Sequence, residues 1–255
     1  MKHLFAAAAI AAGLTIAGSA SAGVVLSQNF DSIDIHAPGF NPASPGFQTD
    51  YAFRTGSQNT PDHVNSMYDE GTWTIAQNPI NSHNLWRDED LGSNALILNG
   101  KTLPPGDPNS TAWAQTATGV GAGHYTFSFD AYDVCCNANF GGFNAASLLT
   151  LSYSLNGGST LNAATIDTST TVFETAPGSG HYHVTGSFDL GQSGDIKVSL
   201  LNWAGAPGGN DFAVDNISVA GGVPEPATWA MMLVGFGGLG AMLRANRRRM
   251  ASATA

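Results

Sequence analysis

The feature that most constrains the fold is a series of short segments in which apolar and polar residues alternate. In the clearest, 124–131 (HYTFSFDA), the aromatic positions share one face and the polar positions share the other. A period of two is that of a β-strand with one buried face. Strand-like segments separated by turn residues recur at 23–30, 72–75, 95–98, 111–116, 148–155, 181–188, 195–202 and 211–219. No convincing 3.6-residue period interrupts them, so an all-β domain is predicted.

Turn signals indicate how these segments connect. Asn156-Gly157 directly follows 148–155, and this pair is the strongest short signal for a hairpin. Sheets with one apolar face must bury it against another layer, which favours an antiparallel jelly-roll β-sandwich. The interval 32–71 is too long for a hairpin loop, and we expect it to wrap the sandwich edge.

Composition supports one globular domain and excludes some partners. The chain has 255 residues, of which 43% are hydrophobic and 11% charged, and about 200 remain between its two ends. Those 200 residues hold four basic residues against 18 acidic ones, a difference of about −14. Such a surface repels nucleic acid, and we expect no nucleic-acid partner.

The N-terminus has the three parts of a secretory signal. Lys2 precedes an apolar run over 4–17, and Ala20-Ser21-Ala22 ends the segment as an A-x-A cleavage site. This order predicts a signal peptide over 1–22 and a mature chain that works outside the cytoplasm. The alternative is a buried N-terminal helix.

The C-terminus combines an apolar stretch with a basic end. Residues 227–243 carry no charge, and as a helix they would extend about 25 Å, against a hydrocarbon layer of about 30 Å. They can span if Arg244 snorkels and Trp229 lies at the opposite interface. The orienting residues of the predicted cytoplasmic tail, 244–255, are Arg244, Arg247, Arg248 and Arg249. A buried core helix, the alternative, leaves these arginines unexplained.

A family resemblance covers about the last 30 residues. Pro224, Glu225 and Pro226, followed by Trp229 and a glycine-rich apolar span ending in arginines, resemble the PEP-CTERM sorting signal in its PEPxxWA variety. The resemblance implies recognition by an exosortase at 221–226 and transient anchoring in the inner membrane of a Gram-negative bacterium. Release to the cell surface or an extracellular polysaccharide matrix would follow. It implies no chemistry for the domain over 23–220.

A second resemblance concerns this domain. Segments 73–79 (WTIAQNP), 94–100 (NALILNG), 113–116 (WAQT) and 209–218 (GNDFAVDNIS) are similar to carbohydrate-binding-module-like, galactose-binding-like jelly rolls of exported bacterial proteins. The similarity spans about 70–219 and implies a fold rather than a ligand.

The same resemblance implies a calcium ion. The first and last strands of such jelly rolls usually lie side by side, which would bring Asp31 near Asp211 and Asp215. Carboxylates at strand ends suit Ca²⁺, which has a structural role in these modules. Many relatives have Asp-Asp where this chain has Asp215-Asn216, and Asp31 and Asp215 could instead cap turns.

Two tryptophans are candidates for stacking on sugar rings. Trp86 and Trp203 each lie beside a polar, turn-rich loop, whereas Trp113 alternates with alanines and is expected in the core. A core position is the alternative for Trp86 and Trp203 as well.

Other chemistry-bearing residues lack a motif. Cys135 and Cys136 are adjacent and could form a disulfide with each other or between chains, or remain buried thiols. His181 and His183 would face one side of a strand, as in a transition-metal site, but without a third ligand at motif spacing partly exposed histidines are favoured.

We therefore predict an exported, non-catalytic protein that binds glycans or has a structural role in exopolysaccharide. The alternative is a polysaccharide-active enzyme, a glycoside hydrolase or lyase, that uses loop carboxylates. Its candidates are Asp69, Glu70, Asp88, Glu89 and Asp90. Neighbouring carboxylates on one loop seldom flank a sugar from two sides, which favours binding over catalysis.

Overall fold

A computed structural model describes residues 23–56, 65–102, 111–137, 148–167, 180–203, 210–221 and 232–244. The predicted signal peptide at 1–22 and the Pro224–Trp229 motif lie outside these ranges, as do Arg247, Arg248 and Arg249. Residues 23–222 form one compact unit.

Eleven strands and one short 3₁₀ helix, η2 (Pro79–Asn81), form the described part of this unit. The strands are β1 (Val24–Gln28), β2 (Ala52–Phe53), β3 (Thr72–Ala76), β4 (Ala95–Asn99), β5 (Thr111–Val120), β6 (Gly123–Asp133), β7 (Leu148–Leu155), β8 (Leu161–Asp167), β9 (His181–Leu190), β10 (Gly194–Asn202) and β11 (Phe212–Gly221).

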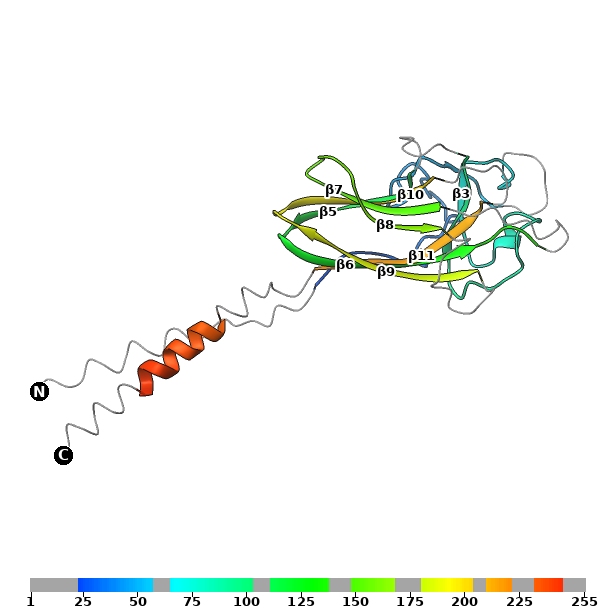
Figure 1. Cartoon of the computed structure of the whole chain (residues 1–255). Coiled ribbons are helices and arrows are strands. Elements are labelled where there is room, and N and C mark those ends of the chain that lie inside the picture. Colours follow the sequence, from blue (N-terminus) through cyan, green and yellow to red (C-terminus); the bar gives the residue numbers. More distant parts are fainter. Residues whose placement is uncertain are drawn as a thin grey trace, which may run out of the picture. The chain divides into compact units, whose positions relative to one another are not determined.

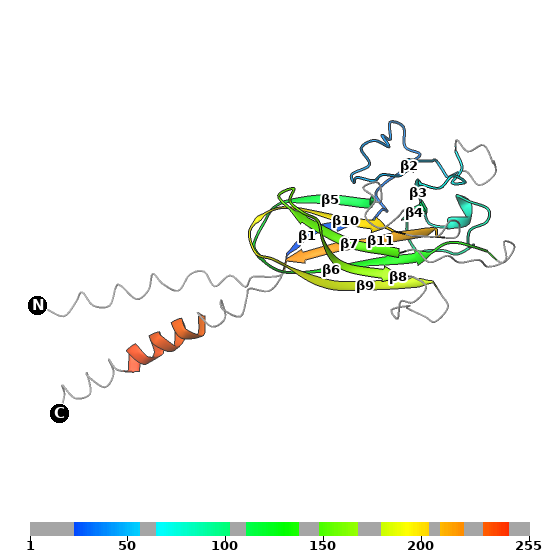
Figure 2. The same ribbon diagram turned by 45° about the horizontal axis from the view of Figure 1, so that its top comes forward.

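The strands form two stacked sheets (Figure 1), and the predicted β-sandwich is confirmed. The larger sheet has the order β2-β3-β4-β11-β6-β9. β1 pairs with the later part of β11, on the same edge of that strand as β4, which pairs with its beginning. The smaller sheet has the order β5-β10-β7-β8. Every pair is antiparallel except β2 with β3. Figure 2 shows β5 and β10 above β6 and β9 from a second direction.

The core lies between the sheets, as the alternation in β6 predicts. Phe127, Phe129 and Ala131 of β6 face it and are buried, together with Trp113 of β5. Intervening residues of β6, such as Thr126, therefore point away from the smaller sheet.

The first and last strands are neighbours, as expected. β1 pairs antiparallel with β11, and the Gly221 amide donates to the Gly23 carbonyl at 2.8 Å. A register shift interrupts the β11–β6 ladder between Asp215 and Ser218, where Asn216 has a φ of 52°. This bulge re-aims the outward side chains of β11.

The sequence pattern missed two strands, β2 and β8. Asn156-Gly157 does follow β7, with positive φ at both residues, but β8 begins only at Leu161. The described part of 32–71 contains β2 and a two-way backbone bridge from Gln48 to Ala114 at the edge of β5, consistent with a wrapping segment.

Residues 232–244 form a helix in a second unit. It lies largely within the predicted span 227–243, whose first residues are outside the described ranges. Among the described residues, no helix is both long enough and apolar enough to cross a bilayer. The transmembrane helix remains a prediction.

Candidate functional site

The outer face of the larger sheet, which points away from the smaller sheet, divides into two halves. Loops cover one half, over the ends of β4, β6 and β11, and bury a second, smaller apolar cluster there. The other half, over β6, β9 and the end of β11, is open and carries serine, threonine and histidine side chains. We call them the covered half and the open half.

The covered half is a packed satellite core. Its buried members are Met67, Trp86, Leu91, Ala95, Ile97, Tyr132, Val134, Cys135, Cys136 and Ala213. Trp86, with 0% exposure, is its largest side chain and stacks on His83 at 4.9 Å between ring centroids. Burial lowers the pKa of His83 to about 4, which keeps this ring neutral at physiological pH.

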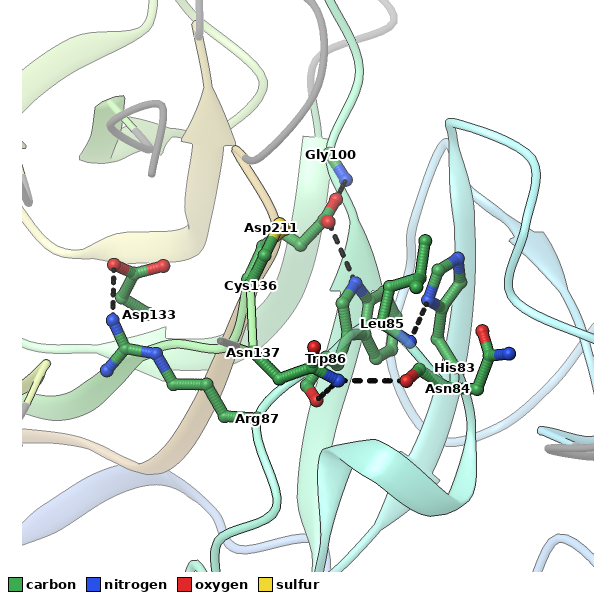
Figure 3. Close-up of a disulfide and its surroundings, with 11 residues drawn as sticks. His83, Asn84, Leu85, Trp86, Arg87, Gly100, Asp133, Cys136, Asn137 and Asp211 are labelled. Carbon is green, nitrogen blue, oxygen red and sulfur yellow. Dashed lines mark hydrogen bonds and ion pairs between the residues drawn. A yellow bond between two sulfur atoms is a disulfide. The ribbon is translucent and has the colours of Figure 1, made fainter. Parts of the chain in front are cut away.

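Asp211, at the start of β11, holds the covering loop in place (Figure 3). The Trp86 Nε1–H donates to Asp211 Oδ2 at 2.8 Å, and the Gly100 amide donates to Oδ1 at 2.9 Å. Burial raises the pKa of Asp211 to about 6, and the two hydrogen bonds oppose that rise. One carboxylate thus joins three segments that are distant in the sequence.

A second buried carboxylate ties the same loop to β6. Arg87 donates from Nη2 to Asp133 Oδ2 at 3.3 Å (Figure 3). Burial raises the pKa of Asp133 to about 7, although the guanidinium of Arg87 acts in the opposite direction. Gly180 has a φ of 72°, and a Cβ there would lie 2.5 Å from Arg87 Nη1. Glycine at this position leaves room for the guanidinium.

The open half contains a shallow depression of about 560 Å³, here called the trough. Its lining residues are His124, Thr126, Phe127 and Ser128 of β6, Thr185, Gly186 and Ser187 of β9, and Ser218 and Ala220 of β11. In the sheet register, Thr126 is opposite Ser187, and Ser128 is opposite both Thr185 and Ser218. The floor is therefore a row-by-row array of hydroxyl groups.

A histidine–aspartate pair lies at each end of this array. His124 Nδ1 is 2.7 Å from Asp189 Oδ1, and His183 Nδ1 is 2.6 Å from Asp130 Oδ1. Both pairs are cross-strand partners of β6 and β9. The side-chain Nδ2 of Asn216, in the β11 bulge, donates a hydrogen bond to the other carboxylate oxygen of Asp130, Oδ2, at 2.8 Å. This bond fixes the carboxylate beside the trough.

Tyr132, His181 and Glu89 lie where the two halves meet. The rings of Tyr132 and His181 are edge to face at 4.8 Å, and His181 Nε2 is 3.5 Å from Glu89 Oε1. Burial, and then the nearby carboxylates led by that of Asp130, raise the pKa of Tyr132 to about 12. Tyr132 therefore stays a neutral hydroxyl group.

The trough is lined without a lysine or arginine. Of the domain's four basic residues, Arg87 pairs with Asp133 and Arg54 with Asp69, while Lys197 is on β10 of the other sheet. Lys101 donates to the Asp50 carbonyl. The described lining of the trough thus offers hydroxyl groups and the imidazole of His124, and no lysine or arginine; the carboxylates and the imidazole of His183 lie beside it.

One comparison identifies a segment near the C-terminus. Residues 222–249 match the family described as the PEP-CTERM protein-sorting motif. The chain carries a PEP-CTERM sorting signal. Such a motif implies exosortase-sorted export, with a transient membrane anchor before release, as the sequence predicted.

The comparisons with whole proteins are more distant than the PEP-CTERM match. No curated protein matches. The chain is similar to the CBM22-1 xylan-binding domain of Paenibacillus barcinonensis Xyn10C (11% identity, TM-score 0.38, 78% of this chain and 95% of that chain). It is also similar to a Stig cyclase, Fisc, of Fischerella sp. TAU (14%, TM-score 0.46, 80% and 100%) and to the sugar-binding EclA C-terminal domain (16%, TM-score 0.30, 46% and 72%).

The structure corrects the prediction for Trp86. Trp86 is completely buried, so the ring offers no face to a sugar. The adjacent polar, turn-rich loop suggested exposure, but the Trp86 indole donates to Asp211, 125 positions away. Trp203 is half-buried at the end of β10, in the other sheet, and its role as a sugar contact stays a prediction.

The three predicted metal ligands do not come together. Asp211 is used by Trp86 and Gly100, as described above. Asp31 and Asp215 are close enough for Asp31 to raise the pKa of Asp215. The neighbouring residues Ser93 and Asn94 each donate a hydrogen bond to one of them. Ser93 Oγ donates to Asp215 Oδ2 at 2.7 Å, and the backbone N–H of Asn94 donates to Asp31 Oδ1 at 3.0 Å. Within the described residues, no group of three or more His, Cys, Asp or Glu side chains could hold a metal ion.

A disulfide joins the neighbouring Cys135 and Cys136, both buried in the covered half. His181 and His183 do share the outward face of β9, but each pairs with a different carboxylate, His181 with Glu89 and His183 with Asp130, so the two do not converge on one site.

The loop carboxylates support the covering loop. Asp88 accepts from Asn78 Nδ2 at 2.8 Å, and Asp90 accepts from Gln77 Nε2 at 2.8 Å. The trough and its two His–Asp pairs were not recognised from the sequence. The alternation of 124–131 had placed Thr126, Ser128 and Asp130 on one face, and this was the signal that could have located them.

Proposed function

We propose that this PEP-CTERM protein is a non-catalytic polysaccharide-binding protein of the cell surface or extracellular matrix, and that the trough is its binding site. The observation that carries the proposal is the hydroxyl array on β6, β9 and β11 between two His–Asp pairs. Hydroxyl groups both donate and accept hydrogen bonds, and they complement the hydroxyl groups of a sugar chain.

The His–Asp pairs can take part directly. A carboxylate next to Nδ1 favours the tautomer that carries its proton there, which leaves Nε2 as an acceptor. In His124 and His183 the side chains are 49% and 53% exposed, so Nε2 is available to a sugar hydroxyl. The aspartates orient the imidazoles, and the imidazoles accept from the ligand.

Rigidity also favours binding. The trough belongs to paired strands, and the Asn216 bond holds Asp130 from the side. A preformed site loses little conformational entropy when the ligand binds.

Catalysis is not favoured by the same residues. A tyrosine that acts as a base needs a lowered pKa, whereas that of Tyr132 is raised. Asp88, Asp90 and Asp69 already bind side chains of their own surroundings.

A structural calcium ion remains part of the proposal, in a reduced form. Among the described residues, Asp215 Oδ1 is buried without a hydrogen-bond partner, and the carboxylate of Asp31 is close enough to raise the pKa of Asp215. These two carboxylates could contribute to a Ca²⁺ site with backbone carbonyl groups, and Asp211 would not. Asp215→Asn should remove any calcium-dependent rise in melting temperature, and a rise that survives this change contradicts the site.

The binding test fills the trough. Thr126→Trp should abolish retardation of the full-length protein in gels that contain soluble neutral polysaccharide. The matched control is Thr118→Trp, an exposed threonine of β5 in the other sheet. Equal retardation of both variants and the parent would contradict the site.

Reducing-end or double-bond product assays on the same polysaccharides test the absence of catalysis. We expect no product above the buffer control. Turnover that disappears in Glu89→Gln would favour the enzyme alternative instead.

A further inference from the structure

We infer that the trough binds one linear, uncharged polysaccharide chain lengthwise along β6, with the His124–Asp189 and His183–Asp130 pairs as its two end subsites. This inference rests on the proposed function and specifies the class of its ligand.

The spacing of the two His–Asp pairs carries the first step. Of their four residues only His124 lines the trough itself, so the pairs extend the site beyond the trough along β6. His124 and His183 belong to register rows that are six residues apart along β6, from position 124 to position 130. At about 3.4 Å per residue, the two pairs are about 20 Å apart. Across the sheet, β11, β6 and β9 span only about 10 Å, because neighbouring strands lie about 4.8 Å apart. A site twice as long as it is wide suits an extended chain rather than a single sugar unit.

The chemical likeness of its two ends carries the second step. Each end presents an imidazole on one strand, held through Nδ1 by a carboxylate on the neighbouring strand. The histidine is on β6 at one end, as His124, and on β9 at the other, as His183. Between them, the hydroxyl rows Thr126–Ser187 and Ser128–Thr185 repeat at the two-residue period of the strands. A polymer of identical sugar units can contact the repeated hydroxyl rows and both His–Asp pairs at the same time.

The charges carry the third step. Asp189 and Asp130 put a carboxylate at each end, and the side chain of Asp189 is 80% exposed. The described lining offers no lysine or arginine to a uronate or sulfate group. An anionic chain would therefore meet repulsion at both ends, whereas a neutral chain would not.

The test is a length series measured by calorimetry on the full-length protein in a detergent without a sugar headgroup. The probes are neutral β-linked xylose or glucose oligomers of two to six units and a polyuronate hexamer. We expect the neutral hexamer to bind at least about tenfold more tightly than the dimer, because two end subsites act together. The polyuronate hexamer should bind at least about tenfold more weakly than the neutral hexamer.

Single variants locate the ends. His124→Ala and His183→Ala should each remove most of the advantage of the hexamer over the dimer. The control His36→Ala changes an exposed histidine in the 32–50 segment and should behave as the parent does. Affinity independent of length, an effect of only one of the two variants, or equal binding of the polyuronate overturns this inference while leaving glycan binding in place. Absence of binding to every probe overturns the proposed function as well.

Discussion

The two halves of the outer face share strands β6 and β11, but loops bury the outward side chains in one half and leave them exposed in the other. In the covered half, the outward residues include Tyr132 and Ala213, and loops bury them with Trp86. In the open half, the outward residues are Thr126, Ser128 and their neighbours, which line the trough. A change in polarity along one strand thus decides where a sheet is covered by its own loops and where it remains available to a partner.

The largest expected effect is a loss of stability when the covered half is changed. Trp86→Ala should lower the free energy of unfolding by about 3–5 kcal/mol, because it empties the satellite core and leaves Asp211 with one donor fewer. Denaturant titration measures this loss. A loss below about 1 kcal/mol would mean that the covered half contributes little to the fold.

The pH dependence of stability should come from the covered half. In the folded protein the pKa of Asp133 is about 7 and that of Asp211 about 6, both above the ordinary 3.8. The folded state therefore retains protons that the unfolded chain has released, so this contribution is complete below about pH 4 and is lost as the pH rises through 6 and 7. We expect unfolding at pH 7.5 to require less free energy than at pH 5, by on the order of 2 kcal/mol.

Asp133→Asn is the control for this pH effect. It retains an oxygen acceptor for Arg87 but removes the titrating group, so the difference between pH 5 and pH 7.5 should shrink. An undiminished difference would assign the pH effect to other carboxylates.

A smaller effect concerns the packing beneath the trough. A Cβ at Gly186 would lie 2.4 Å from Cζ of Phe127, a core ring, so Gly186→Ala should destabilise the protein by about 1–3 kcal/mol. Gly191→Ala is the matched control, because a Cβ there meets no atom within 4 Å. Similar melting temperatures for the two variants would show that the core ring moves without cost.

The smallest effect on stability is expected in the trough itself. Ser128→Ala and Thr185→Ala should each change the free energy of unfolding by less than about 0.5 kcal/mol, because their hydroxyl groups face solvent. Both should weaken polysaccharide retardation in gels. A stability loss comparable to that of Gly186→Ala would make these hydroxyls part of the fold rather than of a binding site.

Much of the fold was predictable because it depends on local pattern. Strand-like segments bounded by turn residues identified nine of the eleven described strands, and the two missed strands have clear reasons. β2 has only two residues, and β8 (LNAATID) has alanines and an asparagine where alternation needs larger apolar side chains. The sorting signal was predictable because its parts are contiguous.

The site was less predictable because its pairs join distant segments. His124 and Asp189 are 65 positions apart, and only the register of β6 with β9 brings them together. The prediction for Trp86 was wrong for the same reason, since the polar, turn-rich loop beside it suggested exposure, whereas its partner Asp211 directly precedes β11. The existence of a strand can be predicted from its own segment of sequence, whereas the register of a strand pair depends on both segments.

The hydrogen bond between Gly221 and Gly23 means that the sandwich starts and finishes at one corner. A mechanical load applied at Gly221, the last residue of β11, enters along the axis of that strand, and a polymer held along β6 would pull nearly parallel to that axis. The β6–β11 ladder would then be loaded in shear, with its hydrogen bonds sharing the force, rather than being peeled open one bond at a time.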